Sequence, residues 1–190
     1  MEKRSFEEII KILKVRTNSV FIDVGAHIGR YSLILAKMFP NAKIIAVEPD
    51  PETYQALIRG IEANKIKDIT ALNIALSDFD GIANLYRKRG TRILSLVKHE
   101  DSFNIVELPV KHLDIIVEKL KVSRVNAIKI DVEGAELHVV KGALNTITRY
   151  KPILIIEIKE RNLQNLVSLL TSLNYNCKHL EDMDHICNAL

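Results

Sequence analysis

The spacing of hydrophobic residues changes at one point near the start of the chain. Val20, Phe21 and Ile22 form an apolar run that is typical of a strand buried on both faces. After Gly25 and Gly29, apolar residues recur three and four positions apart, as on one side of a helix. We therefore predict a strand, a glycine turn and a helix. A ligand is expected at the turn, because free backbone N–H groups of a helix start lie there beyond the strand end.

The alternation of strand and helix continues along the chain. Apolar runs that fit buried strands lie at 42–47, 69–76, 127–130 and 153–156. Stretches with helical spacing lie at 51–61, 113–120, 136–147 and 163–170, and a closing hairpin is expected at 175–190. This order predicts an α/β fold, a Rossmann-like three-layer α/β/α sandwich with a mostly parallel sheet and right-handed crossovers.

Two segments lie outside this alternation. Ser5 and Glu8 fit a capping box ahead of an apolar stripe, which predicts an amphipathic helix within residues 1–17. Residues 82–110 are the least regular, and Pro109 argues for a strand at a sheet edge. We interpret 82–110 as an insertion over the site. The 190 residues are enough for one buried core, so a single domain over 1–190 is expected.

Charge and cysteine content narrow the functional classes. A formal charge of +3 is nearly balanced, so nucleic-acid binding would need a local basic patch. The charged first residues and the lack of any apolar run of about 18 residues predict a cytoplasmic protein without a secretory leader or a membrane partner. Cys177 and Cys187 could face each other across the predicted hairpin, but we prefer two free thiols in that compartment.

Several predicted strands end in a carboxylate. Asp23, Glu48, Asp131 and Glu157 end four of them, and Asp78 follows a fifth. Because the carboxyl ends of parallel strands share one sheet edge, these acids should form an acidic rim. Carboxylates accept hydrogen bonds from ribose hydroxyls and stabilise positive charge, so the rim favours a nucleoside-like ligand.

Details of the glycine turn restrict that ligand further. Glu48 follows the second strand, where an acid typically binds ribose hydroxyls, although a helix-capping role is the simpler alternative. His27 stands where a dinucleotide fingerprint would need glycine, which disfavours a pyrophosphate and a dehydrogenase. Asp23 would repel a phosphate but attract an amino group or a sulfonium.

These motifs resemble a known family. Residues 23–29, Asp-Val-Gly-Ala-His-Ile-Gly, and 47–51, Val-Glu-Pro-Asp-Pro, resemble the first two motifs of class I methyltransferases that use S-adenosylmethionine. More narrowly, four stretches are similar to the FkbM family: Leu113-Asp114, residues 128–136 (Ile-Lys-Ile-Asp-Val-Glu-Gly-Ala-Glu), Lys141-Gly142-Ala143 and Ile156-Glu157-Ile158. The most specific part is the Asp-Val-Glu-Gly-Ala-Glu string at 131–136.

The resemblance implies a seven-stranded sheet with a reversed last hairpin, S-adenosylmethionine as cofactor, and O-methylation of a small molecule or sugar. Carried onto this sequence, it implies these cofactor-binding residues: the loop of Asp23, Gly25, His27 and Gly29 for the methionine moiety, Glu48 for the ribose, and Ser77 with Asp78 for the adenine. His27 stands where such loops often have glycine or asparagine, and Lys159 where many family members have histidine.

The catalytic candidates are Asp131, Glu133 and Lys129. Methyl transfer is an in-line displacement, so a base is needed only if the acceptor must lose a proton. Asp131 and Glu133 are expected to face the acceptor, while Glu133 and Glu136 could instead cap the next helix. Lys129 should share a strand face with Asp131, as an ion-pair partner or as a base. No spacing demands a metal, although Asp131, Glu133 and Glu157 could ligate one through oxygen.

Two other functions remain open. A ribose-methylating RNA enzyme could use the basic segment 87–99, which contains Arg87, Lys88, Arg89, Arg92, Lys98 and His99. A solvated loop is the simpler interpretation of that segment, because it has no aromatic side chain to stack on bases. The chain could also be a cofactor-binding module without catalysis. The sequence identifies neither the acceptor nor the oligomeric state.

Overall fold

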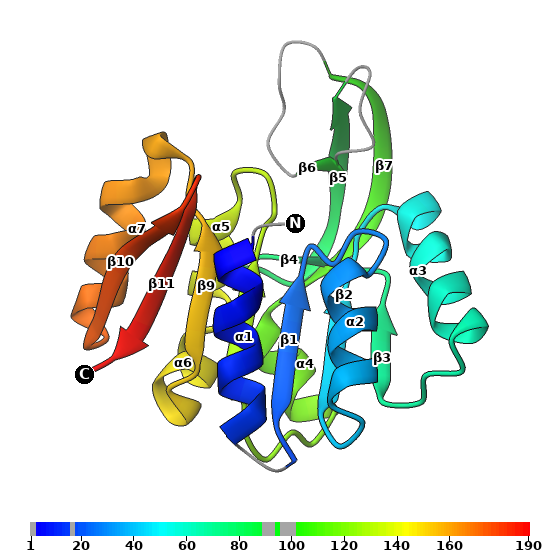
Figure 1. Ribbon diagram of the computed structural model, residues 1–190. Helices are drawn as coiled ribbons and strands as arrows, with labels where there is room; N and C mark the ends of the chain where they lie inside the picture. The colour runs from blue at the N-terminus through cyan, green and yellow to red at the C-terminus, as the bar shows by residue number, and fades with distance from the viewer. Residues whose placement is uncertain (1–2, 16–17, 89–93, 96–101) are drawn as a thin grey trace.

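The protein folds around a seven-stranded sheet (Figure 1). The computed structural model describes residues 3–15, 18–88, 94–95 and 102–190. The strands of this sheet lie in the order β10-β11-β9-β8-β1-β2-β3. They are β1 (Val20–Val24), β2 (Lys43–Val47), β3 (Ile69–Leu72), β8 (Ala127–Ile130), β9 (Ile153–Glu157), β10 (Tyr175–Glu181) and β11 (Asp184–Ala189).

The pairing directions confirm the predicted fold class. From β3 to β9 every neighbouring pair is parallel, and only β11 runs antiparallel to both of its neighbours. The segment expected to form a closing hairpin is therefore β10 and β11. Parallel neighbours need crossover connections, and helices supply them here. The sheet is mostly parallel with an antiparallel C-terminal hairpin, as predicted.

Helices cover both faces of the sheet. The helices are α1 (Lys3–Val15), α2 (Arg30–Met38), α3 (Pro51–Ala63), α4 (Leu113–Lys119), α5 (Glu136–Lys141), α6 (Leu144–Tyr150) and α7 (Glu160–Ser172). Alternate strand residues such as Phe21 and Ile155 pack with Ile9 of α1 and Leu35 of α2. Their neighbours in sequence face the other way and pack against α4 to α7. Burial on both faces explains why these strands are continuous apolar runs.

A second sheet stands beyond the carboxyl edge of the first. It has the order β4-β7-β5-β6, with β4 (Ala75–Leu76), β5 (Gly81–Lys88), β6 (Leu94–Ser95) and β7 (Ser102–Lys111). The antiparallel strands β5 and β7 project past the ends of the central strands (Figure 1). We call β5 and β7 the ribbon. They account for most of the predicted insertion at 82–110.

The predicted strand 69–76 is in fact two strands in different sheets. β3 ends at Leu72 and β4 begins at Ala75. Between them, Asn73 Nδ2 donates hydrogen bonds of 2.9 Å to the carbonyl oxygens of Glu48 and Pro49. These side-chain bonds hold the chain beside the end of β2, so the strand cannot continue straight, and β4 pairs with β7 instead.

The predicted helix 136–147 is likewise interrupted, between α5 and α6. A Cβ atom on Gly142 would lie 2.0 Å from the Ser77 carbonyl oxygen, so the chain at this point touches another backbone. The new helix is held by Asp114, whose carboxylate accepts hydrogen bonds from the N–H groups of Asn145 and Thr146. Packing between distant segments therefore sets this break.

The capping-box prediction was wrong. Ser5 lies inside α1, which extends from Lys3 in the described part of the chain. Its backbone N–H donates 2.8 Å to Glu181 Oε1, and its hydroxyl donates to Asp184 Oδ2. Ser5 therefore joins the first helix to the C-terminal hairpin. In the part of the chain that the structure describes, no helix is long and apolar enough to cross a bilayer.

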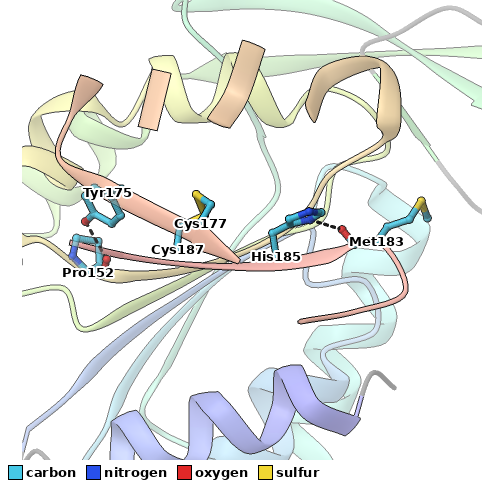
Figure 2. Close-up of a disulfide and its surroundings, with 6 residues drawn as sticks. All are labelled: Pro152, Tyr175, Cys177, Met183, His185 and Cys187. Atoms are coloured by element: carbon cyan, nitrogen blue, oxygen red, sulfur yellow. Dashed lines mark hydrogen bonds between the residues drawn. A yellow bond between two sulfur atoms is a disulfide. The ribbon is translucent and has the colours of Figure 1, made fainter. Parts of the chain in front are cut away.

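The two cysteines form a disulfide, so the expectation of free thiols was also wrong. Cys177 and Cys187 stand directly opposite each other in the β10–β11 pairing, which brings their sulfur atoms together (Figure 2). At the same end of the hairpin, the Tyr175 hydroxyl donates 2.8 Å to the Pro152 carbonyl oxygen. The hairpin is thus tied to itself and to the segment before β9.

We predict that reducing the disulfide lowers the free energy of unfolding by about 2–3 kcal/mol, as expected for a short closed loop. Urea denaturation with and without a thiol reductant measures this difference. The double variant Cys177→Ala/Cys187→Ala serves as the control, since its stability should not respond to the reductant. Equal stability of the oxidised and reduced parent protein would contradict the prediction.

Candidate functional site

The acidic strand ends gather at one edge of the sheet, as predicted. β2, β1, β8 and β9 are consecutive neighbours, and Asp23 pairs in register with Lys129. Asp23 lies inside β1, Glu157 ends β9, and Glu48 and Asp131 follow β2 and β8 directly. The structure therefore places four acids on adjacent strands at a single edge.

The glycine turn packs directly against the end of β8. The N–H groups of Gly25 and Ala26 both donate 2.9 Å to the Val47 carbonyl oxygen. Gly25 and Gly29 have φ angles of 81° and 82°, which glycine adopts without strain. A Cβ atom on Gly25 would lie 1.8 Å from the carbonyl oxygen of Asp131. Gly25 is needed both for its backbone angle and for this contact between the two walls of the site.

His27 also has left-handed backbone, with φ at 52°. Glycine and asparagine adopt this conformation most readily, which explains why such loops often have them at the position of His27. The N–H of His27 donates 2.7 Å to Glu48 Oε2. His27 is thus joined to the predicted ribose-binding acid through its backbone, and its side chain is exposed.

Glu48 organises the loops on both sides of it. Its Oε2 accepts from His27, and its Oε1 accepts 2.9 Å from the N–H of Asp50. The residue is 7% exposed. Burial raises the pKa of Glu48 to about 7, although both backbone hydrogen bonds act in the opposite direction. Each carboxylate oxygen has two lone pairs, so each can accept a further bond from a hydroxyl.

Asp23 lies deeper than a ligand-contacting residue. It is 1% exposed, and its Oδ2 accepts 2.6 Å from the Ser32 hydroxyl of α2. Burial raises its pKa, and the nearby Lys129 cation partly offsets that effect. The side chain is enclosed by protein, so its influence on the turn is through its hydrogen bond to α2 and its electric field.

Lys129 is a buried cation beside these acids. Its Nζ lies 2.8 Å from Asp131 Oδ2 and 5.1 Å from the centre of the Tyr31 ring. Burial lowers the pKa of Lys129, but Asp131 and Asp23 outweigh burial and raise it overall. Lys129 thus stays protonated at neutral pH. The arrangement favours the ion-pair interpretation over a role as base, and it shows the shared strand face that the spacing predicted.

Asp131 and Glu157 form a carboxyl pair. They lie at the ends of the neighbouring strands β8 and β9, and each carboxyl group shifts the pKa of the other. Burial opposes ionisation of Asp131, but the charge and hydrogen bond of Lys129 outweigh burial. The pKa of Asp131 is therefore lowered. Burial and the charges of Asp131 and Glu133 raise the pKa of Glu157 to about 8. The proton therefore resides on Glu157.

Glu157 is the functional candidate that the sequence reasoning underrated. The sequence indicates it as a strand-end acid, as part of the family-like stretch Ile156-Glu157-Ile158 and as a conceivable metal ligand, but not as a catalytic residue. The available signal was its position at the end of β9, the strand beside β8, since neighbouring parallel strands bring their last residues together. Among the described residues, no group of three or more acidic, histidine or cysteine side chains has the arrangement of a metal site.

Glu133 and Glu136 have different surroundings in the turn after β8. Glu133 has left-handed backbone with φ at 56°, and its Oε2 lies 2.6 Å from Lys159 Nζ. Glu136 is fully buried, and its Oε1 accepts 2.6 Å from the N–H of Gly134. Asn162 of α7 donates to both Gly134 and Glu136. Glu136 thus stabilises the turn, whereas Glu133 is partly exposed beside Lys159.

Ser77 and Asp78 lie on the other side of the site, after β4. Ser77 donates its N–H to the Lys111 carbonyl oxygen at 3.1 Å. Asp78 Oδ1 lies 3.0 Å from His138 Nδ1 of α5. Burial opposes ionisation of Asp78, but the bonds from His138 outweigh it, so the pKa of Asp78 is lowered. The carboxylate that was predicted to face the adenine is therefore charged.

Arg87, the first residue of the basic segment, is buried and pairs with an acid. Arg87 was a candidate for phosphate contact, but it is 8% exposed, and its Nη1 lies 3.0 Å from Asp50 Oδ2. A buried ion pair leaves it unable to grip a phosphate. The side chains of Lys88, Arg89, Arg92, Lys98 and His99 lie outside the residues that the structure describes.

Curated relatives of the chain include methyltransferases. The chain is 29% identical to methyltransferase 1 of Beauveria bassiana over 66% of its own length and 58% of that protein. It is also 29% identical to the hexuronic acid methyltransferase AglP of Haloferax volcanii, over 76% of this chain and 59% of AglP. The chain thus spans under two thirds of the length of either relative.

The fold has a counterpart among solved structures. The crystal structure of an FkbM methyltransferase from Methylobacillus flagellatus KT matches 90% of this chain and 43% of that chain. The TM-score is 0.65 and the sequence identity 22%, which shows a shared fold. The sequence model of a protein family, the methyltransferase FkbM domain, matches residues 23–177, which is most of the sequence. The chain therefore belongs to the FkbM methyltransferase family.

Proposed function

We propose that the protein transfers a methyl group from S-adenosylmethionine to a hydroxyl group of a small molecule or glycan. The observation that carries this proposal is the position of Glu48. Its carboxylate links the glycine turn to the start of α3 and keeps lone pairs for ribose hydroxyls. The family supports methyl transfer, and the printed name of AglP gives one sugar acid as the acceptor of a relative.

The residues present suit this cofactor. Glu48 would hold the ribose, the turn at Gly25 and Gly29 would lie along the methionine moiety, and Asp78 would lie on the adenine side. Bound S-adenosylmethionine supplies a methyl group on a positively charged sulfur. The acidic edge favours such a cation, because Asp131 is a carboxylate.

The chain also provides for the acceptor's proton. When the hydroxyl oxygen bonds to the methyl carbon, the carbon–sulfur bond breaks and the hydroxyl proton must leave. Glu157 already holds a proton, so Asp131, the ionised member of the pair, is the group that would take the proton of the acceptor hydroxyl. Lys129 holds Asp131 in place, and Glu133 with Lys159 lies beside the pair at the more exposed side.

RNA methylation is less well supported. Arg87 does not face solvent, so the basic segment loses its first contact. Acceptor class is tested by incubating the protein with cofactor labelled in the methyl group and a fractionated extract. We expect label in small hydroxylated molecules or glycans and none in RNA. Label that ribonuclease releases would favour the ribose-methylating alternative.

We predict that Glu48→Gln weakens binding of S-adenosylhomocysteine by about tenfold to a hundredfold, because a charged hydrogen-bond acceptor is lost. Isothermal titration calorimetry measures the affinity. The matched control is Glu62→Gln, an exposed acid on α3, which should bind like the parent. Absence of binding by the folded parent protein would refute the proposed cofactor, and unchanged binding by Glu48→Gln would refute the role of Glu48.

A second prediction follows from the carboxyl pair. The pKa of Glu157 is raised on folding, so its contribution to stability is present below about pH 4.5 and is lost as the pH rises through about 8. Over that range, the free energy of unfolding of the parent should fall by about 1–2 kcal/mol relative to that of Glu157→Gln. Partial exposure of the side chain reduces the amount to this size. Urea denaturation at pH 5, 7 and 9 measures this. The control Glu160→Gln, exposed at the start of α7, should follow the parent, and parallel curves for parent and Glu157→Gln would rule out the raised pKa.

A further inference from the structure

Arg87 connects the ribbon to the loop between β2 and α3. It lies on β5, and its guanidinium contacts both oxygens of Asp50, with Nη1 3.0 Å from Oδ2 and Nη2 3.2 Å from Oδ1. The Nη2–Oδ1 contact is a hydrogen bond, and the Nη1–Oδ2 contact is an ion pair that does not have hydrogen-bond geometry. The side chains are 10% and 1% exposed, so the pair is shielded from water. The contact joins residues 37 positions apart in the sequence.

Asp50 passes this constraint on to Glu48. Its Oδ1 caps α3 by accepting from the N–H of Glu52, and its own N–H donates to Glu48 Oε1. The three residues thus form a continuous chain from the ribbon to the proposed ribose-binding carboxylate. Each of the three side chains is buried. If one of them moved away, its partner would lose a hydrogen bond or an ion pair in a place that water does not readily reach, which costs free energy.

The contacts from Arg87 through Asp50 to Glu48 also determine the charge around Glu48. Asp50 and Glu48 are two acids in contact, and the charge of Asp50 is one cause of the raised pKa of Glu48. Arg87 is the cation that neutralises Asp50 among the described residues. Without Arg87, the uncompensated charge of Asp50 would favour the protonated form of Glu48, which is the weaker acceptor for ribose hydroxyls.

We propose that Arg87 is a positioning residue for the cofactor site, which holds Asp50 and Glu48 in their binding arrangement so that docking of the ribbon and cofactor affinity depend on each other. This inference rests on the proposed function. Because coupling between two sites is reciprocal, a bound cofactor should also stabilise β5 around Arg87.

Calorimetric titration with S-adenosylhomocysteine from pH 6 to 9 tests the proposal on four proteins: the parent, Arg87→Met, Asp50→Asn and the double variant. Arg87→Met should bind about tenfold more weakly at pH 7, with a larger loss at pH 6 than at pH 9. Asp50→Asn keeps a cap residue and the N–H donor while it removes the charge. The double variant should therefore bind like Asp50→Asn alone.

Lys111→Met is the matched control. Lys111 is also on the ribbon, and its Nζ lies 3.2 Å from Asp80, which is not part of the Glu48 network. This variant should bind like the parent. Binding by Arg87→Met within twofold of the parent at every pH would overturn the inference. So would a loss that is equal at all pH values and additive with Asp50→Asn, which would indicate a merely structural role.

Amide hydrogen exchange gives a second readout that does not depend on a stable variant. In the parent, S-adenosylhomocysteine should slow exchange in residues 81–88, and Arg87→Met should lose this protection. If the cofactor analogue binds the parent but leaves exchange at 81–88 unchanged, the coupling is refuted while the proposed function stands. If the folded parent does not bind the analogue at all, both are refuted.

Discussion

A buried lysine allows the acidic edge of this sheet to exist. Lys129 is 4% exposed and lies among Asp131, Asp23 and Asp184, all of which favour its charged form. Several carboxylates on neighbouring strand ends would repel one another and would take up protons if no cation accompanied them. One cation on the central strand β8 keeps Asp131 ionised, while the excess proton is held by Glu157. The proposed acceptor side of the site depends on this division.

A second buried cation, Arg87, pairs with an acid on the Glu48 side of the site. Arg87 neutralises Asp50 beside Glu48, as Lys129 neutralises Asp131 beside Glu157. In each half, an acid with a pKa near or above neutrality lies next to an acid that is paired with a cation. The difference lies in where the cation comes from. Lys129 belongs to the central sheet, whereas Arg87 comes from the ribbon, so the proposed cofactor half depends on a peripheral element.

The sequence predicts those features that depend on residues close together in the chain. Buried parallel strands appear as apolar runs, and Asp50 before Pro51 marks the start of α3, where the structure has its cap. The common face of Lys129 and Asp131 follows from strand alternation. The errors concern contacts between distant segments. Ser5 bonds to the C-terminal hairpin instead of capping its own helix, and Arg87 pairs with a residue on another element. The disulfide depended on an exact pairing register that apolar spacing does not specify.

The disulfide also has a consequence for how the sheet ends. β10 is the outermost strand on its side of the sheet, and its one neighbouring strand is β11. Slippage of such a strand by one residue would turn its inward side chains outward and offer a new edge to other molecules. Cys177 and Cys187 are directly opposite each other, so their bond permits only the native register. The covalent link therefore keeps the outermost strand aligned with β11 at this position.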